Sequence, residues 1–190
     1  MKGILFVEFI DFLESNTDPD TAQEIINNAE VASGGAYSRV GLYDYQELIQ
    51  LLVASANKLD RPADELLGLF SEHLMSMFSR EYPDFFSGAK RAADILKDLD
   101  SHIHVQVKKL YPDAELPSFD YEEQGDKLVL TYQSPRPLAG VAHALIGACI
   151  KHFDTQEEIV TASIAEDQCS ADFIIASKTW QYDRSRQRFN

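Results

Sequence analysis

The chain has 190 residues, a length that suits one domain or one domain with a short tail. Its residues are 45% hydrophobic and 25% charged, as in ordinary globular proteins, and no apolar run approaches the ~18 residues of a membrane span. The 17 basic and 31 acidic residues give a formal net charge of −14, which repels the phosphate backbone of nucleic acids. The composition therefore excludes a membrane-spanning protein and disfavours a nucleic-acid partner.

The N-terminus and the cysteines indicate the compartment. Glu8 and Asp11 interrupt the first apolar stretch, which also lacks a small-residue cleavage site, so we expect no secretory signal. Cys149 and Cys169 are too few for a disulfide framework and too few alone for a zinc site. We expect a protein of the reducing cytoplasm.

The first half of the chain has helical periodicity. The pattern predicts helices from Ile4, from Asp18-Pro19, over residues 45–59, from Pro62 to Pro83, and from Ala89 to about Leu110, where Pro112 follows. Ser33-Gly34-Gly35 is a predicted loop. These elements would form an N-terminal helical part, which we place mainly in residues 1–60.

In the second half, the alternation of apolar residues is typical of strands. A hairpin is predicted around Gln124-Gly125-Asp126, a helix from Pro137, and two strands over residues 158–164 and 171–176. Helices followed by a small antiparallel sheet with packed helices predict an α+β fold, with residues 61–177 forming its second part. Residues 178–190 hold Arg184, Arg186 and Arg188 without periodicity, and we interpret them as a loose tail.

Common catalytic motifs are missing from the sequence. It has no G-x-S-x-G elbow, phosphate-binding loop, dinucleotide glycine fingerprint or H-E-x-x-H helix. The acidic residues lie mostly on predicted solvated helix faces, and no pair stands out as a general acid and base. We therefore expect a protein that is not an enzyme.

His102-Ile103-His104 is the first candidate site. Apolar residues continue at helical spacing through the segment, so the two rings point about 200° apart and do not easily share one metal. Either ring alone is most often a surface or partly buried histidine. A single helical histidine that faces a pocket can instead be the axial ligand of a haem iron.

Tyr132-Gln133-Ser134-Pro135-Arg136 is the second candidate site, at the end of a predicted strand. The guanidinium binds carboxylates bidentately, and two hydroxyls can complete the shell around one anionic group. For so short a pattern alone, a turn with solvent-facing polar residues is the simpler interpretation.

Together these segments resemble the H-NOX family, the haem-nitric oxide/oxygen binding domains related to the haem domain of soluble guanylate cyclase. The resemblance covers roughly Met1 to Ala176. It rests on Met1-Lys2-Gly3-Ile4, on Phe78-Ser79-Arg80-Glu81-Tyr82-Pro83, on the block from His104 through Tyr111-Pro112-Asp113 to Pro117-Ser118-Phe119, and on Tyr132-x-Ser134-x-Arg136. The family's ligand histidine lies seven residues before Tyr111 and thirteen before Pro117, which selects His104 over His102.

The resemblance implies a haem b (iron protoporphyrin IX) buried between the two parts of the fold. His104 would be the axial iron ligand, Tyr132, Ser134 and Arg136 would bind the propionates, and Pro117 would distort the porphyrin. Many bacterial relatives carry a cysteine and histidine cluster near the C-terminal strands. This chain has only Cys169 there, so we expect no zinc site.

Distal residues decide which gas binds, because O2 gains from a hydrogen-bond donor that NO does not need. Oxygen-binding relatives use a distal tyrosine with polar supporting residues, and those positions fall here on Val141, Phe9 and Leu74. Leu5, Phe78 and Leu145 complete the apolar lining. We expect NO and CO to bind and O2 to be excluded.

Family members are sensors that act on histidine kinases, cyclic-di-GMP enzymes or chemotaxis receptors. The resemblance thus implies an NO sensor that regulates a separate signalling partner through release of its proximal histidine. A haem carrier or a redox-sensing haem domain is the leading alternative. A haem-free metal hydrolase that uses His102 and His104 is a weaker one.

Overall fold

The computed structural model describes residues 1–177, and the predicted loose tail lies outside this range. The described chain forms two compact units. The first comprises Met1–Leu74 together with Asp113–Glu115, and the second comprises Met75–Pro112 and the residues from Leu116 onward. Along the sequence, the boundary between the two units lies between Leu74 and Met75, inside one helix. The division near residue 60 stays a prediction.

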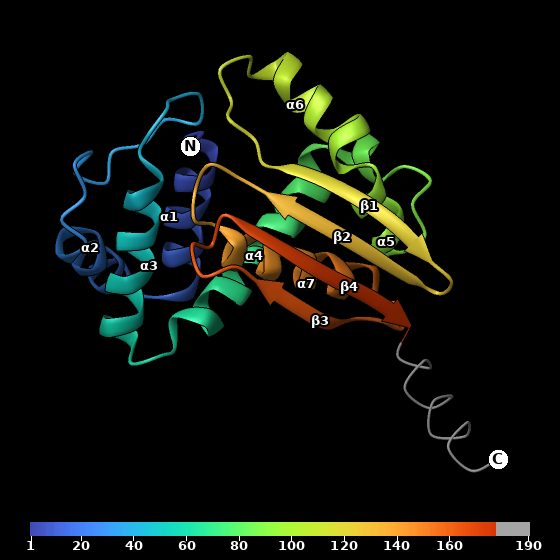
Figure 1. The fold of residues 1–190 in the computed structure, drawn as a ribbon. Coiled ribbons are helices and arrows are strands. Elements are labelled where there is room, and N and C mark those ends of the chain that lie inside the picture. Colours follow the sequence, from blue (N-terminus) through green and yellow to red (C-terminus); the bar gives the residue numbers. More distant parts are fainter. Residues whose placement is uncertain (178–190) are drawn as a thin grey trace, which may run out of the picture. The chain divides into compact units, whose positions relative to one another are not determined.

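The helices of the N-terminal unit follow the predicted pattern (Figure 1). They are α1 (Ile4–Asn16), α2 (Pro19–Asn28), α3 (Tyr45–Leu59) and the first part of α4 (Ala63–Glu81). Asp18 caps α2 by accepting a hydrogen bond from the Thr21 amide at 3.0 Å, and Pro19 occupies the first turn. The Asp44 carboxylate accepts from the Gln46 amide at 2.9 Å and caps α3. The predicted starts of α1 and α2 and both predicted bounds of α3 are confirmed, and α4 lies within the range predicted from Pro62 to Pro83.

A close backbone contact ties the N-terminus to the loop before α3. Lys2 and Leu42 form an isolated antiparallel bridge, and the Gly3 amide donates to the Gly41 carbonyl at 2.9 Å. A Cβ at Gly3 would lie 1.9 Å from the Ser38 carbonyl oxygen. Only glycine permits this approach, which accounts for the glycine of the N-terminal motif.

The second unit does not contain the long helix predicted from Ala89 to Leu110. After a 3-10 turn at Pro83–Phe86, the segment is divided into α5 (Ala92–Lys97), a π-helical turn (Leu99–Ile103) and α6 (His104–Leu110). The prediction of one helix was wrong because apolar spacing does not reveal a one-residue insertion into the hydrogen-bond ladder. The start was also wrong, since the Ala92 amide donates to the buried Glu157 carboxylate at 3.0 Å.

The remainder of this unit is an antiparallel sheet with a helix packed on it. The strands are β1 (Ser118–Gln124), β2 (Lys127–Gln133), β3 (Glu157–Ile164) and β4 (Ser170–Ser177), in the order β1-β2-β4-β3 among the described residues. Helix α7 (Ala139–Phe153) packs against β3, β4 and α5 (Figure 1). It begins two residues later than predicted from Pro137, because the Ala139 amide is held by the Gln168 carbonyl. The α+β fold class is confirmed.

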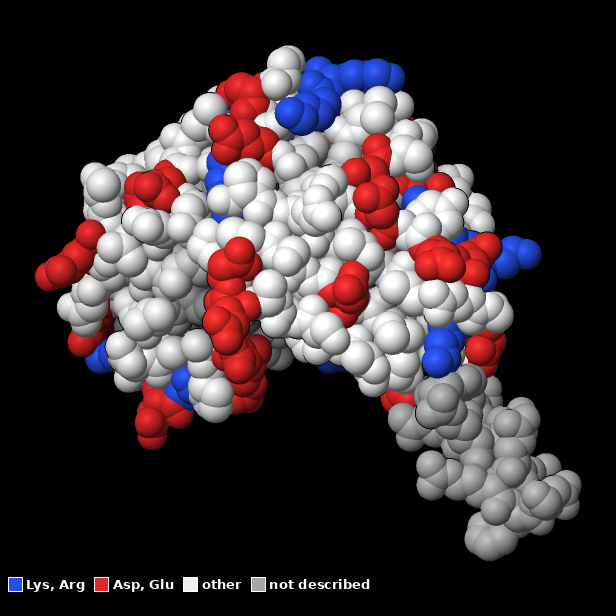
Figure 2. All heavy atoms as spheres, viewed as in Figure 1, with Lys and Arg blue, Asp and Glu red and all other residues white. Residues whose placement is uncertain are grey.

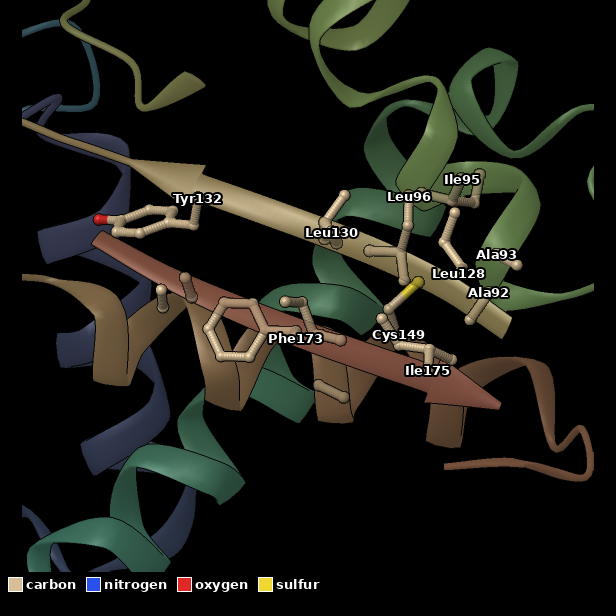
Figure 3. Packing of buried hydrophobic residues seen from close by; sticks show 14 of the residues in the cluster. Ala92, Ala93, Ile95, Leu96, Leu128, Leu130, Tyr132, Cys149, Phe173 and Ile175 are labelled. Atoms are coloured by element: carbon tan, nitrogen blue, oxygen red, sulfur yellow. The ribbon is translucent and has the colours of Figure 1, made fainter. Parts of the chain in front are cut away.

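One face of the sheet forms the core of the second unit. Leu130 and Phe173 are fully buried there, with Leu128, Tyr132 and Ile175 beside them (Figure 3). Cys149 of α7 lies in this cluster, and burial raises the pKa of its thiol to about 12. Both cysteines are free thiols, and Cys149 is a structural residue at neutral pH.

Within residues 1–177, none of the helices combines the length and the apolar character needed to cross a bilayer.

The Gly3 contact gives a first testable prediction. Gly3→Ala should lower the free energy of unfolding by about 1–3 kcal/mol, because the methyl group overlaps the Ser38 carbonyl. Gly68→Ala is the matched control, since a Cβ in the middle of α4 meets nothing within 4 Å. It should be neutral or stabilise by about 0.5–1 kcal/mol through helix propensity. Urea unfolding of both variants measures the difference, and equal stabilities would contradict the prediction.

Candidate functional site

The π-helical turn before α6 sets the position of His104. The Asp98 carbonyl accepts hydrogen bonds from the amides of His102 and Ile103, both at 3.0 Å. The second of these is an i to i+5 bond, so one extra residue enters the ladder and His104 begins a new helical segment. A local π-helix is frequent at functional sites.

Asp100 binds His104 and strand β1 at the same time. Its Oδ1 lies 2.6 Å from His104 Nδ1, and its Oδ2 accepts the Phe119 amide at 3.0 Å. A carboxylate on Nδ1 keeps the proton on that nitrogen and leaves the lone pair on Nε2. This is the arrangement found around metal-ligating histidines, whose second ring nitrogen donates to a carboxylate, carbonyl or water.

His104 faces a pocket of about 430 Å³, which is within the usual size range of cofactor sites. The pocket is lined by Asp100, His104, Val105, Lys108, Lys109, Leu116 and Pro117. An oriented imidazole, an apolar wall and a basic rim fit an anionic, largely apolar cofactor with a metal ion. In the second unit, the structure thus brings together the predicted ligand His104 and the predicted porphyrin contact Pro117.

Basic side chains gather over α6 in the space-filling view, on a face where acidic groups are otherwise widespread (Figure 2). Lys108 and Lys109 lie in the last turn of α6, where they complement the helix dipole. In a chain with a net charge of −14, they give the pocket rim a local positive charge.

His102 has different surroundings from His104. It is exposed, and its ring lies edge-on to Phe85 with 6.4 Å between centroids. The His104 side chain is 17% exposed and its ring lies 5.9 Å from that of Phe119. The two histidines therefore do not converge on one site.

Tyr132 is buried at the end of β2, opposite Phe119 of β1. Their ring centroids are 5.3 Å apart, so Phe119 contacts the rings of both Tyr132 and His104. Burial raises the pKa of the Tyr132 phenol, while a hydrogen bond with the Ser134 side chain and the charge of Arg136 act in the opposite direction. Tyr132 is therefore a neutral phenol that can serve as a donor.

Ser134 and Arg136 lie in the turn that follows β2. The Ser134 amide donates to the Cys169 carbonyl at 2.8 Å, and the Ser134 hydroxyl accepts the Arg136 amide at 3.0 Å. These bonds fix the turn and keep the arginine side chain within electrostatic range of Tyr132. The structure brings the three polar residues of the motif together.

The six predicted distal residues are divided between the units. Leu5 and Phe9 of α1 and Leu74 of α4 belong to the N-terminal unit, where Phe9 and Leu74 are buried. The second unit contains the other three, Phe78, Val141 and Leu145, all partly buried. Their convergence on one pocket stays a prediction.

Sequence reasoning did not find Asp100 or Phe119 as site residues. Asp100 precedes His104 by four residues, a spacing at which helical side chains meet, and this was the available signal. Phe119 lies in the motif block, but its contacts with two site residues depend on strand pairing that local sequence does not specify.

Comparisons with known proteins agree with this site. A family model described as haem-NO-binding matches residues 2–161. The unliganded Fe(II) H-NOX protein from K. algicida is 35% identical, covers 93% of this chain and 96% of its own, and superposes with a TM-score of 0.83. The H-NOX from Shewanella woodyi, solved with IWP-051 in the Fe(II)CO state, is 33% identical over 93% and 94% of the chains, with a TM-score of 0.77.

A third structure, an H-NOX protein from S. oneidensis in the Fe(II)NO state, is 21% identical over 93% of this chain and 99% of its own. Its TM-score of 0.81 shows a shared fold. No curated protein matches the chain. The family-model match over most of the sequence and the 35% identity show that the chain belongs to the haem-NO-binding, or H-NOX, family of haem-binding gas-sensor domains.

Proposed function

We propose that this protein is a haem-based sensor that binds NO and CO, excludes O2 and regulates a separate signalling protein. The observation that carries the proposal is a histidine oriented by a carboxylate, in a pocket that Pro117 also lines. When bound, a haem b would supply a ferrous iron at which small gases coordinate.

Residues of the second unit have the chemistry needed to hold a haem. His104 Nε2 would hold the iron, because Nδ1 is committed to Asp100. Tyr132, Ser134 and Arg136 would bind the propionates, since two hydroxyls and a guanidinium are brought together at the end of β2. Pro117, a rigid ring in the pocket wall, would contact the porphyrin.

Ligand choice follows from the distal side chains. The family includes an H-NOX domain solved as an oxygen complex, as well as relatives solved with CO and NO. Phe9 and Leu74 are buried apolar residues at the positions where oxygen-binding relatives have polar ones, and Val141 stands at the tyrosine position. With Leu5, Phe78 and Leu145 they would supply apolar side chains that offer no hydrogen-bond donor to O2.

With haem bound, His104 would join α6 to the iron. We infer that NO binding would release His104, and that α6 would then present a changed surface to the partner. The partner would be a histidine kinase, a cyclic-di-GMP enzyme or a chemotaxis receptor in the cytoplasm. Residues 1–177 would act as one haem-binding domain without catalytic activity of its own.

The ligand assignment predicts a difference between two histidine variants. His104→Gly should remove the protein bond to iron, so that the haem is lost or depends on added imidazole. His102→Ala should leave the absorption spectrum almost unchanged, because this ring is exposed and packs on Phe85. Haem content and visible spectra of both purified variants test the assignment, and the opposite pattern would exclude it.

The propionate assignment predicts an order of haem retention. Arg136→Ala should release haem faster than Ser134→Ala, because a charge-assisted bidentate contact is about twice as strong as a neutral hydrogen bond. Transfer of haem to apomyoglobin gives the two rates. Equal transfer rates for wild type and Arg136→Ala would refute the role of the arginine.

The apolar distal lining predicts poor oxygen binding. A missing hydrogen bond to O2 forfeits ~1–3 kcal/mol, or roughly one to two decades of affinity, whereas NO gains little from such a donor. The reduced protein in air should show no stable oxygen complex, while NO and CO each give clear spectral changes. A stable oxygen complex in the unmutated protein would mean that the lining contains a donor.

The same experiment separates the sensor from the haem carrier. Loss of His104 from the iron on NO binding should give a five-coordinate nitrosyl spectrum. A nitrosyl complex that keeps its histidine would favour the carrier or redox-sensing function.

A further inference from the structure

We propose that Asp100 is a positioning residue that sets the strength of the bond between His104 and the iron, and thereby how readily NO releases it. The inference rests on the proposed function and assigns the control of histidine release to a residue outside the ligand set.

The geometry holds the Asp100 carboxylate at two points. One oxygen lies 2.6 Å from His104 Nδ1, a distance typical of a short charge-assisted hydrogen bond, and the other accepts the Phe119 amide at 3.0 Å. Rotation of the carboxylate away from His104 would leave the β1 amide without its acceptor. The strand therefore locks the carboxylate in the orientation that the imidazole needs.

The surroundings favour a strong interaction. The His104 side chain is 17% exposed, and the Phe119 ring packs 5.9 Å from the imidazole, so water competes weakly for Nδ1. The Asp100 side chain is 39% exposed, and its two oxygens contact the His104 ring and the Phe119 amide. The backbone supports the pair as well, since the π-helical turn contains Asp100 and ends immediately before His104.

The hydrogen bond between Asp100 and His104 affects how strongly the imidazole binds a metal ion. A carboxylate acceptor on Nδ1 increases electron density on the ring and raises the basicity of Nε2 toward a metal. Such partners typically change metal affinity by about 10–100-fold when they are removed. His104 paired with Asp100 should therefore bind iron more strongly than a histidine paired with a neutral acceptor, and should resist release.

The charge of Asp100 can be changed without removing an acceptor for the β1 amide. The Phe119 amide needs only one acceptor oxygen, which an amide side chain also offers. Asp98, two residues earlier, is exposed and uses its backbone carbonyl in the π-helical turn. Asp98→Asn therefore removes the same charge as Asp100→Asn but leaves the contact at His104 Nδ1 in place.

The experiment compares Asp100→Asn, Asp100→Glu and the control Asp98→Asn in the haem-loaded ferrous protein. Resonance Raman spectroscopy of the unliganded state measures the iron–histidine stretching vibration. We expect Asp100→Asn to lower its frequency, Asp100→Glu to restore it in part and Asp98→Asn to leave it unchanged. After NO addition, Asp100→Asn should convert to the five-coordinate nitrosyl about tenfold faster than wild type.

The outcomes separate this inference from the proposed function. The inference would be overturned if Asp100→Asn changed neither the iron–histidine frequency nor the rate of conversion to the five-coordinate nitrosyl. It would also be overturned if Asp100→Asn and Asp98→Asn shifted the frequency equally, because equal shifts indicate a long-range charge effect. If Asp100→Asn does not fold, the iron–histidine frequency of Asp100→Glu is compared with that of wild type. An identical frequency in the two proteins would then overturn the inference. A His104→Gly protein that keeps the vibration would instead refute the ligand assignment and the proposed function.

Discussion

The carboxylate of Asp100 has to satisfy an imidazole of α6 and a backbone amide of β1 at once, and the proximal half of the site depends on this double contact. The contact fixes the orientation of the His104 ring relative to β1. The π-helical turn serves the same end, because the extra residue at Asp98 sets where α6 begins. A local irregularity in the backbone thus produces an oriented metal ligand.

The segment that leaves α6 links the proximal helix to the N-terminal unit through the chain itself. Residues 113–115 belong to that unit, although the residues before and after them belong to the other. Lys2 Nζ lies 3.1 Å from Asp113 Oδ1, and Ala114 is buried. The middle of this loop is thus held by Lys2 of the N-terminal motif, next to the tight contact at Gly3.

Features that depend on local chemistry were predictable from the sequence. Asp18-Pro19 begins α2, residues 45–59 form α3, and Gly125 and Asp126 join β1 to β2. His104 was selected by the spacing of a family motif, which periodicity could not do, since periodicity treated both histidines alike. The starts of α5 and α7 and the contact of Asp100 with β1 were not predictable, because each depends on a hydrogen bond to a partner distant in the sequence. The Phe119 amide, the Gln168 carbonyl and the Glu157 carboxylate are such partners.

Gas choice and histidine release follow from different interactions in the proposed mechanism. Choice depends on whether a donor faces the gas, and Phe9, Leu74 and Val141 provide none. Release depends on the basicity of His104, which Asp100 controls from the opposite ring nitrogen. A substitution on the distal side changes the hydrogen bonds available to O2 without touching Nδ1, and a substitution at Asp100 changes the iron–histidine bond without adding a distal donor. In the proposed mechanism, gas selectivity and the readiness of histidine release would therefore vary separately, because the distal residues and Asp100 are different side chains.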